Sequence, residues 1–289
     1  MSIRSILVPL LPREEPAAPL NAAAELAHRF AAHLDALFIR PDPADVFVSM
    51  PNFALDERIT FEDVEADGRR TAIAARERFE NWRTASVLAG RSPAVGLDPS
   101  GHGPFAHWHE HVGPAEDAIV ERGRLSDIIV QHFPASETHR SNTLFAASAF
   151  ATARPVLLVR SEVEQDMLRR VLVAWDGGLD AARAVAGAMP LLEASGHVTV
   201  FTAPGHGSPE DCHASLCDAL RRHGIKAEQT WGHRSDADVG AAILRAAAER
   251  EASLIVMGAT PRSRIERLLF GGATRHVLRT SSLPVLMAH

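Results

Sequence analysis

The sequence lacks the features of several specialised classes of protein. Only two of its 289 residues are cysteine, Cys212 and Cys217, which excludes a disulfide framework. Their spacing would place them on different faces of a helix, so we interpret both as reduced structural thiols. No stretch approaches the ~20 apolar residues of a membrane span. The N-terminal apolar run, residues 6–11, is too short for a signal-peptide core. We therefore expect a cytoplasmic protein with no membrane partner.

Common catalytic motifs are also missing from the sequence. It has no GxSxG elbow, no HExxH helix and no phosphate-binding loop ending in GK[ST]. Asp176 and Asp180 could form a catalytic carboxylate pair. We interpret them instead as a loop acid and an acid in the first turn of a helix, where the helix dipole favours negative charge. We expect no conventional enzyme, and at most a weak ATPase.

Composition and charge describe an ordinary globular chain. Hydrophobic residues make up 46% and charged residues 23%, so a sizeable core can be buried. The length suggests two domains. The net charge of -6 argues against broad binding to the phosphate backbone of nucleic acid, so we expect no nucleic-acid partner.

Three segments recur in the same order along the chain. SILVPLL (5–11) matches RVLVAWD (170–176), SDIIVQH (126–132) matches SLIVMGA (253–259), and ARPVLLVRS (153–161) matches SLPVLMAH (282–289). Each is a short apolar run of the kind found in strands that are buried on both faces of a parallel sheet. The chain therefore encodes one unit twice. We call residues 1–160 the first copy and residues 170–289 the second copy, joined by a linker at 161–169.

The spacing of the repeats reveals an insertion in the first copy. The first segments lie 165 residues apart, whereas Pro155 and Pro284 in the third segments lie only 129 apart. The first copy thus carries 36 extra residues before its second segment. We assign the main insertion to residues 41–64, an irregular apolar stretch, and expect it to cover a surface or a partner. Residues 61–85 then predict a long helix.

Between the strand-like runs the second copy shows helical patterns. We expect helices over 179–195, 209–224, 235–251 and about 273–280, and strands over 197–203 and 226–232. Gly224 should close one helix, and Ser235 or Asp236 should cap another. In the first copy, 21–33 predicts a helix and 34–40 a strand. This alternation predicts an α/β fold with two tandem doubly wound five-stranded parallel sheets, with ligand loops after Ala174, Ala203 and Met257.

The segments 171–185 and 255–289 carry a family resemblance. VLVAWDGGLDAARAV resembles the opening strand, acidic loop and first helix of universal stress proteins, and IVMGATPRSRIERLLFGGATRHVLRTSSLPVLMAH resembles their C-terminal signature. The resemblance implies a Rossmann-like fold of the adenine nucleotide alpha hydrolase type and a role in stress response. It also implies pairing of domains through final strands, here 155–160 and 284–288. That pairing could occur within one chain, in a homodimer, or in both.

In some members of the family a glycine-rich loop binds ATP or AMP. Its pattern is glycine, two residues, glycine, nine residues, then glycine followed by serine or threonine. Gly258 and Gly271 match the first and third glycines, while Pro261 replaces the second and Gly272 replaces the hydroxyl residue. Pro261 removes one N–H donor. The resemblance thus implies a weakened or altered site for ATP or AMP, with Mg²⁺, formed by Asp176, Gly258, Arg262, Ser263, Gly271 and Gly272.

The glycines also have a purely structural interpretation. Gly258 could simply end a strand, and Gly271 with Gly272 could start a tightly packed helix. The first copy has no glycine over 128–150 and has Leu11 in place of Asp176, so we expect it to bind no ATP in the family manner. A small-ligand-binding regulator, a scaffold without nucleotide, and a slow ATP hydrolase or metal-binding variant therefore remain as functional hypotheses.

Histidines alternate in the segment FAHWHEH (105–111). On a strand, His107, His109 and His111 would share one face, which is a geometry suited to Zn²⁺, and Glu110 would point the other way. The alternative is a polar face on an edge strand, where polar residues discourage aggregation. We assign no metal site from the sequence and retain the three histidines as candidates.

Overall fold

The structure is a computed structural model in which most of the chain is described. The described residues are 2–12, 17–49, 60–89, 104–133, 139–163, 166–203, 211–232, 238–259 and 272–289. Within them, no helix is long and apolar enough to cross a bilayer.

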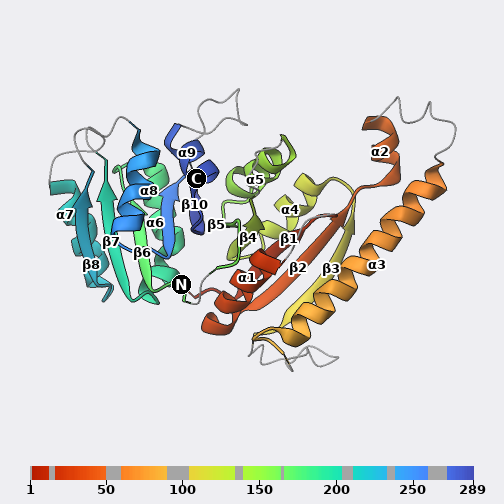
Figure 1. The fold of residues 1–289 in the computed structure, drawn as a ribbon, viewed down its shortest axis with the longest axis horizontal. Helices are drawn as coiled ribbons and strands as arrows, with labels where there is room; N and C mark the ends of the chain where they lie inside the picture. The colour runs from red at the N-terminus through yellow and green to blue at the C-terminus, as the bar shows by residue number, and fades with distance from the viewer. Residues whose placement is uncertain are drawn as a thin grey trace. The chain divides into compact units, whose positions relative to one another are not determined.

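Apart from an additional helix, α2 (Pro43–Ser49), strands and helices of the first copy alternate as the sequence predicts (Figure 1). They are β1 (Ser5–Leu10), α1 (Ala17–Phe30), β2 (His33–Arg40), α2 (Pro43–Ser49), α3 (Phe61–Ala85), β3 (Ala106–Val112), α4 (Ala115–Gly123), β4 (Ile128–His132), α5 (His139–Ala151) and β5 (Val156–Val159). The predicted long helix over 61–85 matches the bounds of α3.

The second copy repeats this order without the insertion. Its elements are β6 (Arg170–Ala174), α6 (Leu179–Glu193), β7 (His197–Thr202), α7 (Asp211–Arg222), β8 (Ala227–Trp231), α8 (Val239–Glu249), β9 (Leu254–Gly258), α9 (Gly272–Thr280) and β10 (Val285–Ala288). Gly224 closes α7 with a φ of 76°, as predicted. Helix α6 buries Ala181, Ala184, Ala188 and Leu191, whose spacing of three or four residues defines one face.

The ten strands follow the order β3-β2-β1-β4-β5-β10-β9-β6-β7-β8. Each copy thus contributes five strands in the same internal order. The pairs β1–β2, β1–β4 and β2–β3 are parallel, as are their counterparts β6–β7, β6–β9 and β7–β8. The predicted α/β fold class is confirmed, with a doubly wound set of five strands in each copy, but the two predicted sheets are joined as one ten-stranded sheet through β5 and β10.

The final strands of the two copies pair with each other. β5 and β10 run antiparallel, with Leu158 opposite Val285 and Val156 opposite Met287. The pairing that the resemblance implied between 155–160 and 284–288 is therefore present within one chain. The strands are only four residues long, but every one of their residues is buried.

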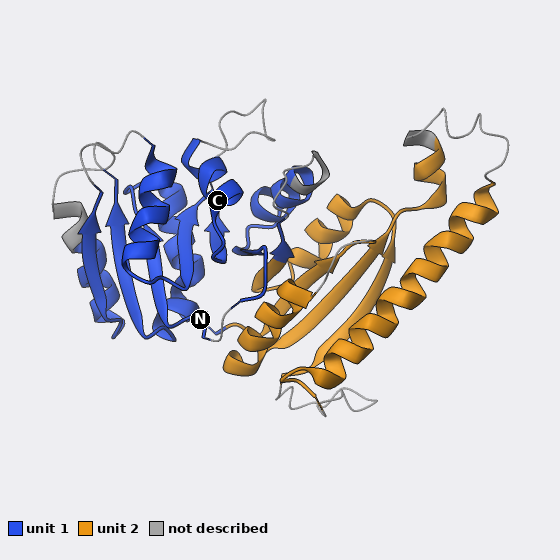
Figure 2. Cartoon of the chain, viewed as in Figure 1, with its two compact units in different colours: residues 1–2, 131–289 blue, residues 3–130 orange. Residues whose placement is uncertain are grey.

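The chain divides by its contacts into two compact units, residues 3–130 and residues 1–2 with 131–289 (Figure 2). This division differs from the predicted domains at 1–160 and 170–289. The β5–β10 pairing accounts for the difference, since it brings the end of the first copy into the unit that holds the second. We keep the repeat boundaries as a proposal about the two copies, while the units describe the packing.

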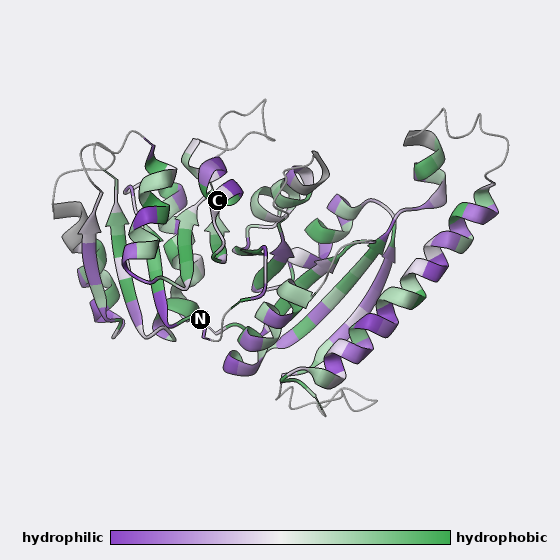
Figure 3. Cartoon of the chain, viewed as in Figure 1, coloured by the Kyte–Doolittle hydropathy of each residue, from purple (hydrophilic) through white to green (hydrophobic). Residues whose placement is uncertain are grey.

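The central strands form the apolar core. The exposed fractions of Ile6, Leu7, Ile129, Leu172 and Ile255 are at most 2%, as expected for strands covered on both faces. Hydrophobic colouring accordingly follows these strands in Figure 3, whereas α3 is largely hydrophilic. Along its 25 residues α3 buries only Ala72, Ala75 and Phe79, so it lies on the sheet through a narrow stripe.

Two local predictions were wrong. Residues 43–49, expected to be irregular, form α2, because the Asp42 carboxylate accepts the N–H of Ala44 at 2.8 Å and Pro43 occupies the first helical position. The start of α8 is capped by Asp238, whose Oδ1 accepts the N–H groups of Gly240 and Ala241. Ser235 and Asp236, the predicted caps, lie outside the described residues.

Candidate functional site

A cavity of about 600 Å³ lies at the carboxyl ends of β6, β7 and β9. This is the edge at which a doubly wound sheet places its ligands. The lining residues come from three strand ends and from the starts of α6, α8 and α9: Ala174, Trp175, Asp176, Ala181, Phe201, Ala203, Asp238, Val239, Ile243, Met257, Gly258, Gly272, Ala273 and Thr274. All of them belong to the second copy and to one compact unit.

One wall of the cavity is apolar. Phe201 and Met257, at the ends of β7 and β9, are nearly buried, and Ile243 faces the cavity from α8. These side chains form a surface from which water is excluded, and a flat organic ring could pack on it. Trp175 adds an indole to the lining, and within the described part of the chain its buried Nε1 has no hydrogen-bond partner. An unpaired buried donor is costly, so an acceptor on a bound molecule would stabilise this group.

Asp176 stands at the carboxyl end of β6. Its Oδ1 accepts the N–H of Gly178 at 2.8 Å, and Gly178 is the N-cap residue of α6. The carboxylate therefore closes the turn into α6 while its side chain lines the cavity. Asp180 has a different environment, because its Oδ1 lies 3.1 Å from Nδ1 of His289 and 3.7 Å from the Arg183 guanidinium. The two carboxylates thus have different partners: Asp176 binds the start of α6, and Asp180 lies near His289 and Arg183.

A second acid, which the sequence did not single out as a site residue, enters the cavity from α8. Asp238 caps α8, and its Oδ2 lies 2.7 Å from Nδ1 of His276 on α9. Partial burial raises the pKa of Asp238. The N–H groups of Ala241 and Gly240 and the His276 imidazole outweigh that effect, so the net pKa is below the usual value. The signal available in the sequence was an acid two residues before a glycine.

Glycine at position 240 permits the close approach of α8 to α9. A Cβ there would lie 2.5 Å from Cβ of His276 and 2.9 Å from the carbonyl oxygen of Ala273. Real Cβ atoms do not approach other atoms so closely, so any other residue would push the two helices apart. Gly240 thereby sets the distance across which Asp238 and His276 meet.

The start of α9 forms another part of the lining. Gly272, Ala273 and Thr274 belong to its first turn, where N–H groups have no partner within the helix. Such a terminus attracts anions through those donors and the helix dipole. The other end of α9 is held by the first copy, since the Arg160 guanidinium donates to the carbonyl oxygens of Leu278 and Arg279.

Gly258 is fixed by packing. A Cβ at this position would lie 2.8 Å from the backbone N of Ala181 and 2.8 Å from the backbone carbon of Asp180. The first turn of α6 thus rests on the end of β9. Gly272 differs, because a Cβ there would meet no described atom within 4 Å. The structural interpretation therefore accounts for glycine at 258 but not at 272.

The structure brings together three of the six predicted site residues. Asp176, Gly258 and Gly272 line one cavity, although they come from three separate segments. The other three, Arg262, Ser263 and Gly271, lie outside the described residues, as does Pro261.

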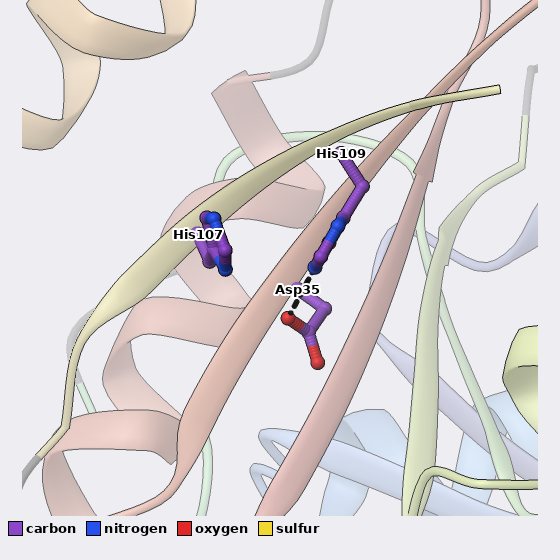
Figure 4. A group of neighbouring side chains, drawn as sticks. All are labelled: Asp35, His107 and His109. Carbon is purple, nitrogen blue, oxygen red and sulfur yellow. Dashed lines mark hydrogen bonds and ion pairs between the residues drawn. The ribbon is translucent and has the colours of Figure 1, made fainter. Parts of the chain in front are cut away.

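The alternating histidines lie on β3, which is the first strand in the order and hence an edge strand. His107 and His109 share one face with Asp35 of β2 (Figure 4). His111 is not a member of this group. Glu110 points the other way, as predicted, and accepts a hydrogen bond from Arg40 at 2.9 Å. Burial and the neighbouring His109 lower the pKa of His107, and the Asp35 carboxylate opposes them in part.

Comparison with known proteins finds a family model that matches the end of the chain. Residues 204–289 match the model of the universal stress protein family. No curated protein matches the sequence significantly.

Solved structures share the fold of the whole chain. A universal stress protein from Archaeoglobus fulgidus superposes with a TM-score of 0.71 at 15% identity, covering 99% of this chain and 96% of that one. A functionally unknown protein from Pseudomonas aeruginosa gives a TM-score of 0.56 at 20% identity over 99% of this chain and 92% of its own. The end of this chain therefore carries a universal stress protein domain, and the whole chain has the tandem fold of the universal stress protein that it resembles.

Proposed function

We propose that this chain is a universal-stress-type regulatory protein that binds an adenine nucleotide, ATP or AMP, in the cavity of its second copy. The observation that carries the proposal is the convergence of Asp176, Gly258 and the start of α9 on one cavity of about 600 Å³. That volume is within the usual ~300–1,000 Å³ range of ligand sites.

Each part of the cavity matches one part of a nucleotide. The wall formed by Phe201, Ile243 and Met257 would contact the adenine ring. Asp176 would accept hydrogen bonds from the ribose hydroxyls, because an ionised carboxylate is an acceptor only. The N–H groups at the start of α9 would bind phosphate oxygens. With ATP, Mg²⁺ would accompany the phosphates.

A scaffold without nucleotide is the competing function, and two observations favour it. Gly258 is required by the packing of α6 whether or not a ligand binds. In the described lining, moreover, the charged side chains are the acids Asp176 and Asp238, which repel an anion. A nucleotide would therefore have to place its phosphates at α9, away from both carboxylates.

The first experiment measures binding directly. The purified full chain is denatured and the supernatant is analysed for released ATP or AMP, and the melting temperature is then recorded with and without ATP and Mg²⁺. A ligand at 100 times its Kd stabilises the folded form by about 2.7 kcal/mol. No released nucleotide together with no response at millimolar ATP would leave the scaffold as the function.

Matched variants locate the site. Asp176→Asn should weaken ATP binding about tenfold, whereas Asp218→Asn, which changes an exposed acid of α7 paired with Arg221, should leave it unchanged. Gly272→Ser restores the family's hydroxyl where a side chain has space, and should strengthen binding several-fold. If all three variants bound ATP with the same affinity, the nucleotide would have to bind outside this cavity. Phosphate release by the wild type measures any slow hydrolysis.

A further inference from the structure

Three potential metal ligands meet on one face of the β2–β3 pair. The parallel register sets Asp35 directly opposite His107, and His109 follows two residues later on the same face of β3. One ligand atom from each of the three residues lies within 4.8 Å of the other two. Figure 4 shows the three side chains gathered on this face.

The contacts within this cluster are closer than a merely polar edge requires. Nε2 of His109 lies 3.0 Å from Oδ1 of Asp35, and the ring centroids of His107 and His109 are 4.4 Å apart. An edge strand needs polar residues to prevent aggregation, but that purpose does not require two imidazoles in contact. All three side chains sit on strands, and strands hold ligands more rigidly than loops do.

In the second copy, two of the three corresponding positions contact an arginine side chain. Strand register makes Thr199, Glu228 and Thr230 the counterparts of Asp35, His107 and His109. There the Arg250 guanidinium donates to Glu228 at 3.0 Å and to Thr230 at 2.9 Å. In the first copy, imidazoles replace an acid and a hydroxyl. The lone pair of a neutral imidazole is a common ligand for metal ions.

The geometry points to a binding site for a divalent transition-metal ion, Zn²⁺ in the first instance, formed by Asp35, His107 and His109. Two nitrogens and one carboxylate oxygen are a ligand set that zinc accepts, with water completing the tetrahedron. Ligand atoms in such a site lie about 3.3 Å apart, given bonds of ~2.0–2.1 Å. The 3.0 Å pair is already near that separation, and small side-chain rotations would bring His107 to it.

Chemistry also decides which ions the site should select. Imidazole ligands favour Zn²⁺, Ni²⁺ and Cu²⁺ over Mg²⁺ and Ca²⁺, which prefer oxygen. Nε2 of His109 can bind a metal ion only when it carries no proton. The neutral imidazole must therefore have its proton on Nδ1 for this atom to act as a ligand. The side chains of His109 and Asp35 are 26% and 34% exposed, so the ion can enter from solvent. A bound ion would hold the edge strand β3 against β2.

The test uses the full chain, freed of metal by chelation and dialysed. Calorimetric titration with ZnCl₂ should show one tight equivalent, and MgCl₂ should give no heat. Co²⁺ should produce the visible absorption of a tetrahedral complex with nitrogen and oxygen ligands. No heat with ZnCl₂ would overturn the proposal.

Variants separate this site from the other histidines of the chain. His107→Gln and Asp35→Asn should each weaken the tight equivalent at least tenfold, and His107 is exposed enough for its variant to fold. His111→Gln is the matched control, since His111 lies on the same strand outside the group, and it should bind like the wild type. Equal affinity in His107→Gln, or an equal loss in His111→Gln, would overturn the proposal. Circular dichroism confirms that each variant is folded.

Discussion

The two copies share one strand register but differ at the carboxyl ends of their strands. In the first copy Ile6 is opposite Ile128, and in the second Val171 is opposite Leu254. Counting along the strands from these pairs makes Leu11 the counterpart of Asp176 and His132 the counterpart of Gly258. A common framework thus carries different residues at the edge of the sheet that borders the cavity in the second copy.

Side chains occupy these positions in the first copy. Leu11 is buried, and so is Nδ1 of His132, for which no partner is found among the described residues. Gln131, at the place of Met257, is buried and accepts a hydrogen bond from Ser148 of α5 at 2.8 Å. In the second copy the same positions hold Asp176, which is exposed, Gly258, and Met257, which forms part of the cavity wall. The difference teaches that one fold can present different side chains at this edge, so the residues at the strand ends, rather than the fold, determine its chemistry.

The largest expected effect comes from giving the second copy a side chain at 258. Gly258→Ala should lower the free energy of unfolding by about 3 kcal/mol, at the upper end for overpacking, because the new Cβ meets backbone atoms of α6 at 2.8 Å. Urea denaturation followed by circular dichroism measures it. Gly272→Ala is the control and should change stability by less than about 0.5 kcal/mol, since the site is open. Similar losses in both variants would contradict the packing argument.

The second-largest expected effect comes from a substitution in the first copy. Arg40 is 8% exposed and donates to Glu110 at 2.9 Å and Glu65 at 3.1 Å, joining β2 to β3 and α3. Arg40→Met should cost about 2 kcal/mol, the value of hydrogen bonds to charged groups. Hydrogen exchange should rise in α3 and β3 and stay unchanged in α7 and β8. Arg70→Met, which removes an exposed pair with Asp67, should have almost no effect.

A smaller effect follows from helix capping, in which the copies also differ. Asp238 caps α8, whereas the N-cap residue of the counterpart helix α4 is Pro114, which makes no side-chain cap hydrogen bond. Asp238→Ala should cost about 1 kcal/mol at neutral pH. The lowered pKa of Asp238 gives the pH dependence: its stabilisation is complete above the unfolded pKa and disappears as pH falls through the folded pKa. The difference between wild type and variant should therefore shrink below about pH 4. A constant difference down to pH 2 would contradict it.

The smallest effect tests the link between the copies. Arg160→Met removes the guanidinium that donates to the last carbonyl groups of α9 and should cost about 0.5 kcal/mol. Amide exchange near the end of α9 should increase, while exchange in α7 stays the same. An unchanged α9 would show that the first copy does not stabilise the helix that borders the cavity.

Much of the fold could be predicted from the sequence because the chain contains two regular patterns, apolar runs typical of buried strands and apolar residues at helical spacing. Buried strands such as 170–174 and 254–258 are short apolar runs, and α3 has helical spacing from its first residue to its last. The repeat then predicted the same set of parallel strands in each copy, while the pairing of β5 with β10 was implied by the family resemblance. Local signals of one or two residues were harder to interpret, so Asp42 with Pro43 and the cap at Asp238 were not predicted.

The candidate sites were predicted only in part. Their side chains come from separate segments, and strand register and helix packing, which the sequence pattern does not give, decide which of them meet. Asp176 lies just after β6 and Gly258 ends β9, so both could be placed at strand ends from the pattern. His276 meets Asp238 only because Gly240 lets two helices approach. Asp35 joins His107 and His109 only through the register of β2 and β3, which no spacing within one segment reveals.

The antiparallel contact of β5 with β10 has an evolutionary consequence. Domains that meet in this way within one polypeptide remain together at any dilution, because the tether gives them a high effective concentration. A symmetric assembly of two identical chains must accept every substitution twice. Here one half has an acid and a glycine where the other half has leucine and histidine, so the two halves can change independently at the same positions.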